Sequence, residues 1–339
     1  MHNSKIIGLG HYVPNNVVTN NDLSELMDTS DEWIQERTGI KERRWVTKES
    51  GDTAATMGTK AARIAIEKSG LNKDDIDFII FATMTPDYYF PGCGVQVQNE
   101  LGIKDIGALD VRNQCSGFIY ALSVADKFIK SGTYKNILVI GAELHSGGLD
   151  KTTKGRDVSV IFGDGAGAVV LTRTKLNKGI LSTHLHSDGK YAEELTVLSP
   201  APRYGIGNDN HWLKSLKDNP DDSANFPYMN GKAVFKHAVT KFSEVINEGL
   251  ITNNLNPTDI GLLIPHQANL RISEFVQKQF QLKDDQVFNN IQKYGNTTAA
   301  SIVIALDEAY SQNKIKENDI VVLAAFGSGF TWGSIIIKW

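Results

Sequence analysis

Cysteine is scarce in this chain, with only two cysteines among 339 residues. So few cysteines exclude a disulfide framework and suit a reducing cytoplasm. C-x-x-C and H-E-x-x-H motifs are missing as well, so we expect no metal site. No apolar run reaches the length of a signal peptide or of a membrane span. We therefore expect a cytoplasmic protein that does not engage a membrane.

A marked excess of charge of either sign is also missing. The 35 Lys and Arg residues nearly balance the 39 Asp and Glu residues, which leaves a net charge of −4. This balance gives no electrostatic footprint for nucleic acid, so we expect no nucleic-acid partner. The length allows one large domain or two of about 170 residues each.

What the chain does contain is an internal repeat, in which two pairs of segments match at the same spacing along the sequence. The matching segments are L-N-K-D-D-I-D-F-I-I (71–80) with L-N-P-T-D-I-G-L-L-I (255–264), and N-I-L-V-I-G (136–141) with I-V-V-L-A-A (320–325). A glycine-rich segment at 163–171 resembles 327–337 at a shorter spacing, so we expect a loop around 142–162 to hold the extra length of the first half. Each half reads helix, strand, helix, strand, glycine turn, strand.

The apolar strand runs of both halves predict the fold class. Runs such as F-I-I-F-A predict strands buried on both faces, with helices packed outside them. We therefore predict an α/β protein of two similar halves, 1–172 and 173–339, related by a pseudo-twofold axis. The polar stretch 199–228 is predicted to form surface loops or a lid.

Cys115 is the residue most open to a chemical interpretation. It stands where an irregular segment gives way to a helical pattern in V-R-N-Q-C-S-G-F-I-Y-A-L. A thiol on the first turn of a helix feels unpaired N–H groups and the positive dipole end, so we expect a lowered pKa and a nucleophile. The alternative is a buried cysteine that acts as a small hydrophobic residue.

Two polar residues of the second half provide partners for this thiol. His266 follows the strand G-L-L-I, at the edge where open α/β sheets gather their sites. Asn296 opens a helix of small residues in the second half as Cys115 does in the first, although helix capping alone also explains an asparagine there. If the repeat brings the three together, the thiolate attacks an acyl group while neutral His and the Asn amide donate hydrogen bonds to an enolate.

Several motifs together resemble the β-ketoacyl-[acyl-carrier-protein] synthase III family. They are T-S-D-E-W-I-Q-E-R-T-G-I-K-E-R-R, F-G-D-G-A-G-A, H-Q-A-N-L-R, Y-G-N-T-T-A-A-S and F-G-S-G-F-T-W-G. The resemblance runs from Gly8 to Trp339. It implies a thiolase-like, duplicated five-layer αβαβα fold.

The resemblance also implies a reaction. Cys115 takes the acyl group from acyl-CoA, and His266 and Asn296 promote decarboxylation of malonyl-acyl carrier protein to give a 3-ketoacyl product, the first condensation of type II fatty acid synthesis. The oxyanion hole is formed by backbone N–H groups of Cys115 and Ser328. No cofactor is implied beyond the CoA thioester substrate. The family implies a homodimer, in which Phe90 closes the acyl pocket of the partner subunit.

Further residues match the family's CoA-binding positions. By resemblance these are Thr29, Trp33, Arg37, Arg156, Gly231, Phe235 and Asn269. Trp33 and Arg156 are expected to sandwich the adenine ring through stacking and cation–π contacts. Asn269 is expected to contact the pantetheine arm. Without the resemblance, Trp33 would be read as a half-buried core residue and Arg156 as a solvated one.

A short basic edge offers a place for the carrier protein. Lys232 and Lys236 are four residues apart and share a helix face. Beside Arg271 at the tunnel mouth they are expected to dock the acidic acyl carrier protein. The alternative is an ordinary solvated surface.

Departures from the family pattern leave other interpretations open. The segments N-Q-C-S-G and G-S-G, together with Lys232, resemble relatives that use other acyl starters in polyketide, quinolone or long-chain-ketone pathways. Hydroxymethylglutaryl-CoA synthase would need a glutamate base, and the nearest acidic residues, Glu143 and Glu193, lie in no matching motif. A catalytically inactive partner subunit is disfavoured by the intact Cys-His-Asn set. The segment G-D-G-A-G-A satisfies a dinucleotide fingerprint, but V-V-L-T after it predicts a strand, so we expect a tight turn.

Overall fold

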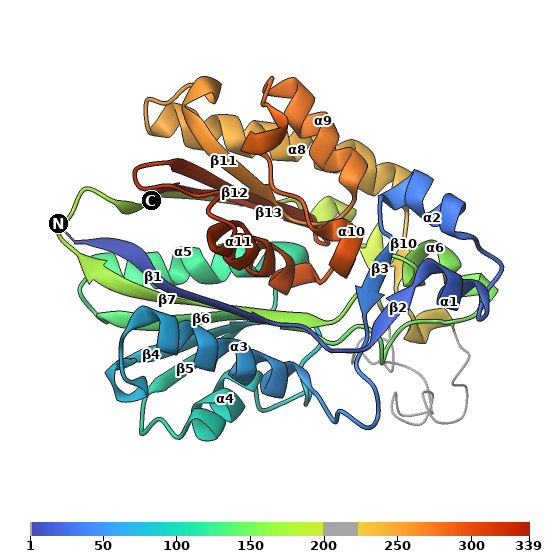
Figure 1. The fold of residues 1–339 in the computed structure, drawn as a ribbon, viewed down its shortest axis with the longest axis horizontal. Coiled ribbons are helices and arrows are strands. Elements are labelled where there is room, and N and C mark those ends of the chain that lie inside the picture. The colour runs from blue at the N-terminus through green and yellow to red at the C-terminus, as the bar shows by residue number, and fades with distance from the viewer. Residues whose placement is uncertain (1, 199–222) are drawn as a thin grey trace.

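The computed structural model describes residues 2–198 and 223–339 (Figure 1). Most of the segment 199–228, predicted to form loops or a lid, therefore lies outside the described residues. The strands are β1 (Asn3–Tyr12), β2 (Val17–Thr19), β3 (Glu42–Arg44), β4 (Phe78–Ala82), β5 (Gly107–Val111), β6 (Asn136–Glu143), β7 (Gly165–Thr174), β8 (Gly179–Ser187), β9 (Leu195–Thr196), β10 (Tyr228–Met229), β11 (Ile260–Pro265), β12 (Ile320–Gly327) and β13 (Thr331–Lys338).

Helices alternate with these strands along the chain. The α-helices are α1 (Asn20–Ser24), α2 (Asp31–Thr38), α3 (Ala54–Ser69), α4 (Cys93–Leu101), α5 (Gly117–Lys130), α6 (Arg156–Ser159), α8 (Gly231–Thr252), α9 (Leu270–Gln279), α10 (Ile291–Tyr294) and α11 (Ser301–Ser311). Short 3₁₀ turns are η1 (Lys73–Asp75), η2 (Gln114–Ser116), η3 (Thr153–Gly155), η4 (Gly189–Tyr191), η6 (Ser223–Asn225), η7 (Pro257–Asp259), η8 (Asp284–Gln286) and η9 (Thr298–Ala300).

Two mixed sheets form the framework of the molecule (Figure 1). The first has the strand order β1-β7-β6-β4-β5 and the second has the order β11-β12-β13-β8. In the first sheet β4 runs parallel to both β5 and β6, and in the second β11 runs parallel to β12. In each sheet the strand after the glycine turn runs antiparallel to its neighbour. All eight residues of β6, N-I-L-V-I-G-A-E, are buried, as expected for a strand covered on both faces.

Helices cover both faces of both sheets (Figure 1). Helices α5 and α11 lie between the sheets, where their apolar residues join those of β4, β6, β12 and β13 in one cluster. Helices α3 and α4 pack on the outer face of the first sheet, and α8 and α9 pack on the outer face of the second. The order helix, sheet, helix, sheet, helix confirms the predicted five-layer α/β fold.

The internal repeat appears in the positions of the elements. Strand β12 follows β6 at the same spacing along the chain as α11 follows α5 and as η9 follows η2. Both 3₁₀ turns begin with a left-handed backbone, at Gln114 (φ 44°) and at Thr298 (φ 49°). The boundary between residues 172 and 173 stays a prediction, and β7 continues through it to Thr174.

The segment G-D-G-A-G-A leads into strand β7. Because no helix follows it, it lacks the context of a dinucleotide fingerprint. The Asp164 carboxylate within it accepts hydrogen bonds from the backbone N–H groups of Val46, His145 and Ser146. These hydrogen bonds hold the loop that follows β6 in place, as expected of a structural turn.

Neither a membrane span nor a metal cluster is found in the part of the chain that the structure describes. Within residues 2–198 and 223–339, no helix combines the length and the apolar character needed to cross a bilayer. The same residues contain no group of three His, Cys, Asp or Glu side chains arranged to hold a metal ion.

Candidate active site

Cys115, His266 and Asn296 line one cavity of about 130 Å³ at the carboxyl ends of the central strands. Cys115 belongs to η2, immediately before α5, and Asn296 lies just before η9 and α11. His266 directly follows β11. Apolar side chains of α8, α9 and β12 form much of the remaining wall. The structure thus brings together the three residues for which the sequence predicted a shared cleft.

Burial governs the ionisation of Cys115. The side chain is 7% exposed, and burial, followed by the charge of Glu143, raises the pKa of the thiol to about 12. The backbone N–H groups of Cys115 and Ser328 and the Thr298 side chain act in the opposite direction by hydrogen bonding to the sulfur. The expectation of a lowered pKa is therefore wrong, because desolvation outweighs the helix N-terminus.

The turn after β12 leaves no room for a side chain beside the sulfur. A Cβ atom added at Gly327 would lie 2.6 Å from Cys115 Cβ and 3.0 Å from its Sγ. The next residue, Ser328, directs its hydroxyl away, to the Leu195 carbonyl oxygen. Hydrogen bonding from its backbone N–H acts to lower the pKa of the Cys115 thiol, and the same kind of donor stabilises an oxyanion.

His266 is held as a neutral imidazole with one free nitrogen. Its Nδ1 lies 2.6 Å from Ser301 Oγ at the start of α11. Its Nε2 is buried and has no hydrogen-bond partner within the described residues. Burial lowers the pKa of the imidazole to about 3, so the ring is uncharged at neutral pH and Nε2 is available to a ligand in the cavity.

Asn296 is oriented by the turn that follows it. Its Oδ1 accepts the Thr298 backbone N–H at 2.8 Å, and its own backbone N–H donates to the Ile161 carbonyl oxygen at 2.9 Å. Because the amide oxygen is occupied, the NH₂ group is the donor that the cavity can use. A buried thiol beside two uncharged donors suits acyl transfer followed by stabilisation of an enolate.

The predicted CoA-binding residues fall into two groups. Gly231, Phe235 and Asn269 line the same cavity as Cys115. Asn269 also caps α9 through Arg271 N–H and donates from Nδ2 to the Arg37 carbonyl oxygen at 2.8 Å. This bond ties the cavity wall to α2, the helix that carries the second group.

Trp33 is the centre of that second group. The guanidinium of Arg37 lies 4.4 Å from the Trp33 ring centre, and that of Arg156 lies 5.1 Å from it. Trp33 and Arg156 are therefore in contact, and they lie too close together for an adenine ring to fit between them as the sequence predicted. Thr29, at the start of the same segment, has a buried hydroxyl with no partner among the described residues.

Four predicted residues lie on the surface. Phe90 is 81% exposed and does not line the cavity of this chain, as expected if it serves a partner subunit. Lys232 and Lys236 are exposed on the first turns of α8. Arg271 is exposed at the start of α9, with its guanidinium 5.7 Å from the ring centre of the cavity residue Phe235.

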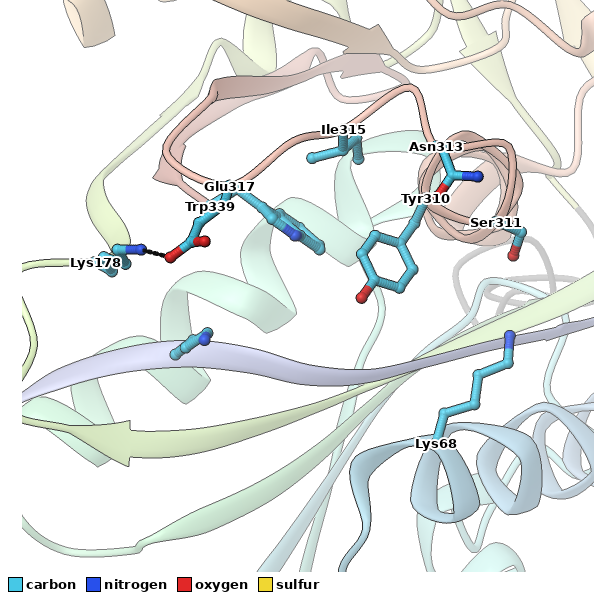
Figure 2. Close-up of a pocket in the computed structure, with 9 residues that line it drawn as sticks. Lys68, Lys178, Tyr310, Ser311, Asn313, Ile315, Glu317 and Trp339 are labelled. Carbon is cyan, nitrogen blue, oxygen red and sulfur yellow. Dashed lines mark hydrogen bonds and ion pairs between the residues drawn. The ribbon is translucent and has the colours of Figure 1, made fainter.

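A larger cavity of about 540 Å³ lies away from this site, beside the end of α11 (Figure 2). Its wall includes Lys5, Lys68, Lys178, Tyr310 and Trp339. Lys178 pairs with Glu317 at 2.6 Å. This larger cavity is lined by none of the residues that the sequence predicted to take part in catalysis or binding.

Sequence reasoning assigned no functional role to three buried residues: Glu143 and Thr298, which act on the pKa of the Cys115 thiol, and His145, which bonds to Thr298. The Glu143 carboxylate accepts hydrogen bonds from the hydroxyls of Thr83 and Thr85, and burial raises its pKa to about 7. It does not line the cavity, and Glu193 is exposed, so neither supplies the base that hydroxymethylglutaryl-CoA synthesis would need. Its position in the sequence could have marked it as a candidate, because Glu143 is the last residue of a buried strand and the carboxyl ends of such strands are where α/β proteins form their sites.

Two models of one protein family match parts of this chain. Residues 109–189 match the model described as 3-Oxoacyl-[acyl-carrier-protein (ACP)] synthase III, and residues 250–339 match its C-terminal model. The chain is 44% identical over 335 residues to the β-ketoacyl-[acyl-carrier-protein] synthase III of Aliivibrio fischeri, covering 99% of both chains. It is 45% identical over 335 residues to that of Shigella dysenteriae, again covering 99% of both.

A solved structure agrees with these matches. The crystal structure of 3-oxoacyl-[acyl-carrier-protein] synthase III from Aquifex aeolicus superimposes with a TM-score of 0.89 at 42% identity. The match covers 99% of this chain and 100% of that one. The likeness therefore extends over both sheets and the cavity between their strand ends.

Proposed function

The chain belongs to the β-ketoacyl-[acyl-carrier-protein] synthase III family, and from that premise we propose how its own residues perform the family's reaction. The enzyme is an acyltransferase that condenses an acyl-CoA starter with malonyl-acyl carrier protein and initiates type II fatty acid synthesis. The observation that carries the assignment of roles is the shared cavity of Cys115, His266 and Asn296.

In the first half-reaction Cys115 is acylated. The sulfur attacks the thioester carbonyl of acyl-CoA, and the oxyanion is stabilised by the backbone N–H groups of Cys115 and Ser328, which also act to lower the thiol pKa. The C–S bond to CoA then breaks and CoA leaves as its thiol. Splitting the reaction through an acyl-Cys intermediate replaces one difficult step by two easier ones.

In the second half-reaction His266 and Asn296 support decarboxylation. The malonyl thioester oxygen accepts hydrogen bonds from His266 Nε2 and from the Asn296 NH₂ group, which the protein itself leaves available. CO₂ leaves and the enolate is stabilised without a charged imidazole. Its carbon attacks the acyl-Cys115 carbonyl, and the C–S bond to Cys115 breaks to give the 3-ketoacyl product. The released thiolate takes up a proton from solvent.

Mass spectrometry of Cys115 tests these roles. Incubation with acyl-CoA is expected to add one acyl group to Cys115 and none in Cys115→Ala. Cys93, the second free and buried cysteine, is the internal control. A chain that remains unmodified on Cys115 would be a partner subunit and not the condensing enzyme.

We infer the CoA and carrier-protein sites from exposed and half-buried residues around the cavity mouth. Thr29, Trp33, Arg37 and Arg156 are assigned to the nucleotide end of CoA, and Gly231, Phe235 and Asn269 to its pantetheine arm.

Lys232, Lys236 and Arg271 offer positive charge to the acidic carrier protein. Lys236→Glu is expected to raise KM for the carrier protein and leave KM for the CoA thioester unchanged, whereas Lys316→Glu, outside this face, changes neither. Equal changes in KM for both substrates in Lys236→Glu would show that Lys236 does not dock the carrier protein.

We infer a homodimer from an uncovered sheet edge. Strand β5 ends the first sheet and is incompletely buried, with Leu109 38% exposed. Such an edge is a template for pairing with a second copy, and Phe90 is then free to close the partner's acyl pocket. Leu109→Arg is expected to halve the mass measured by light scattering, whereas Ile251→Arg, on another face, leaves it unchanged. A monomeric wild type would contradict this.

Two further proposals concern cellular context. The free cysteines Cys93 and Cys115 fit a cytoplasmic location, and the reaction as written needs no cofactor beyond the CoA thioester substrate. The alternative of a ketosynthase for polyketides, quinolones or long-chain ketones is not favoured, because the relatives at 44–45% identity are β-ketoacyl-[acyl-carrier-protein] synthases III. Rates of Cys115 acylation across acetyl, longer, branched and aromatic thioesters would identify the starter.

A further inference from the structure

The backbone of Asn296 is bonded on both sides to a segment that is distant in the sequence. Its N–H donates to the Ile161 carbonyl oxygen at 2.9 Å, and its carbonyl oxygen accepts the Gly163 N–H at 3.0 Å. Phe162, which lies between those two residues, forms an isolated parallel β-bridge with Asn296. Because both backbone groups of Asn296 are bonded to this segment, the position of the segment determines where the Asn296 side chain enters the cavity.

Two side chains bond to the same segment from its other side. Arg43 belongs to β3, and Trp45 directly follows that strand. Arg43 Nη2 donates to the Val160 carbonyl oxygen at 2.7 Å, and Trp45 Nε1 donates to the Phe162 carbonyl oxygen at 3.0 Å. The carbonyl oxygen between these two is the one that accepts the Asn296 N–H. Since Val160 and Phe162 are buried, their carbonyl oxygens would lack a partner without these two donors.

The guanidinium of Arg43 is fixed in direction by its other contacts. Its side chain is fully buried, and Nη1 donates to the Val18 carbonyl oxygen at 3.2 Å and to Asn20 Oδ1 at 2.8 Å. Asn20 in turn donates to Asp31, the first residue of α2, at 2.8 Å. Burial lowers the pKa of Arg43 to about 10, so the group is charged at neutral pH. A planar guanidinium presents its donors in a rigid fork, so acceptors on both terminal nitrogens set its orientation.

The stem of Arg43 packs where the two bridged segments meet. A Cβ atom added at Gly163 would lie 3.2 Å from Arg43 Cβ, and one added at Gly295 would lie 3.4 Å from it. Gly163 follows Phe162 and Gly295 precedes Asn296. Arg43 therefore contacts both sides of the β-bridge that carries the catalytic amide.

We propose that Arg43 and Trp45 are positioning residues for Asn296, because they hold residues 160–163 from the side opposite to it and so place its NH₂ group in the cavity. This deepens the proposed function, since it rests on Asn296 as a donor in decarboxylation. Neither Arg43 nor Trp45 is among the described residues that line the cavity, so both act through the segment. Cys115 is held by a different turn, η2, and its acylation does not depend on them.

Separate rates for the two half-reactions test the proposal. Trp45→Phe keeps an aromatic ring and removes the N–H donor, and it is expected to slow CO₂ release from malonyl-carrier protein about fivefold. Arg43→Met, which loses several donors, should slow it at least about tenfold. Acylation of Cys115 at saturating acyl-CoA should stay within about twofold of wild type in both. Equal losses in both half-reactions, or CO₂ release at the wild-type rate, overturn the proposal.

Two further variants serve as controls for these rates. Gln286→Met removes a side-chain donor to the Ile260 carbonyl oxygen, now bonded at 2.6 Å at the opposite end of β11 from His266, and should change neither half-reaction. If Arg43 acts only through Asn296, adding Arg43→Met to Asn296→Ala should cause no further loss of CO₂ release. A further loss as large as in the wild-type background overturns the positioning role of Arg43.

Amide hydrogen exchange, followed by NMR without any substrate, tests the positioning apart from the reaction. Exchange at the Asn296 and Gly163 N–H groups is expected to be about tenfold faster in Arg43→Met and Trp45→Phe, whereas Leu138, in the centre of the first sheet, keeps its wild-type rate. Exchange that is unchanged at Asn296, or faster to the same extent at Leu138, overturns the proposal. A wild-type enzyme that releases no CO₂ would instead contradict the proposed function and leave these exchange rates as they are.

Discussion

His266 Nδ1 lies 2.6 Å from Ser301 Oγ, so the first residue of α11 fixes the ring that follows β11. When the serine hydroxyl donates to Nδ1, the ring proton stays on Nε2. That is the atom without a partner among the described residues. This one bond therefore sets which face of the neutral imidazole can donate to substrate.

Ser301→Ala is expected to slow condensation about fivefold, because the loss of one orienting hydrogen bond costs about 1 kcal/mol, while acylation of Cys115 keeps its rate. Single-turnover acylation and steady-state condensation measure the two steps separately. Ser243→Ala, which removes a buried serine bonded to Gln279, is the matched control and should change neither. An equal loss in both steps would mean that Ser301 acts only on the general structure.

Asn296 should matter for decarboxylation far more than for acylation. Asn296→Ala is expected to lower the condensation rate by about 10²–10³-fold, as for loss of one preorganised donor to an oxyanion. Asn296→Asp keeps an acceptor for Thr298 N–H, now observed at 2.8 Å, yet lacks the NH₂ donor, so it should be as slow. Release of CO₂ from malonyl-carrier protein by the acylated enzyme is the measurement. Wild-type release in the Asp variant would contradict a donor role.

The sequence predicted much of the fold and that Cys115, His266 and Asn296 would share one cavity, because both depend on patterns of residue type. The buried strand F-I-I-F-A is β4 from Phe78 to Ala82, and one constant spacing along the chain relates β6 to β12 and α5 to α11. Apolar runs and helix starts are local signals, so the helix start at Cys115 and the strand end before His266 follow from them.

The ionisation of the site is less accessible to sequence reasoning. A helix N-terminus predicts a lower thiol pKa, but the degree of burial that raises it to about 12 depends on packing between the two halves. Thr298 and His145 are 153 residues apart in sequence and meet at 2.6 Å. No local pattern marks either residue, because the two meet only when the two halves of the chain pack together.

Glu143 should make the stability of the protein fall as pH rises. Burial raises its pKa from 4.5 to about 7, so the folded state holds a proton that the unfolded state releases between those values. Stability from this group is complete below pH 4.5 and is lost as pH rises through 7, by about 3 kcal/mol. Glu143→Gln should remove this part, measured by urea unfolding at pH 4.5 and pH 8. Identical pH dependence in both proteins would show that Glu143 ionises normally.

The same substitution should activate the thiol. The Glu143 carboxylate raises the pKa of Cys115, and glutamine removes the charge while keeping an acceptor for Thr85, now bonded at 2.7 Å. Acylation at pH 8 is expected to rise severalfold, whereas at pH 5, where Glu143 is protonated, the two enzymes should be equal. A variant slower at both pH values would assign Glu143 to packing alone.

Trp33 should set the affinity for the nucleotide end of CoA. Loss of its stacking face is expected to raise KM for acyl-CoA about tenfold in Trp33→Ala, with kcat nearly unchanged. KM for an acyl-pantetheine substrate, which lacks adenine, should stay the same. Arg63→Ala, on the exposed side of α3, serves as the control. An equal rise in KM for both substrates would show that Trp33 and Arg156 do not bind the adenine ring.

Gly327 should tolerate no side chain, since an added Cβ would lie 2.6 Å from Cys115 Cβ. Gly327→Ala must displace either the nucleophile or the turn that carries the Ser328 N–H, so acylation of Cys115 is expected to fall at least about 10²-fold with the oxyanion donor misplaced. Gly189→Ala, where an added Cβ meets nothing within 4 Å, should keep full activity. Ser328→Gly should also retain activity, because the serine hydroxyl bonds to the Leu195 carbonyl oxygen and not to the sulfur. Acylation rates of the three variants, compared at equal folded fraction by circular dichroism, separate the need for space at position 327 from any need for the serine side chain. An active Gly327→Ala enzyme would place the oxyanion donors elsewhere.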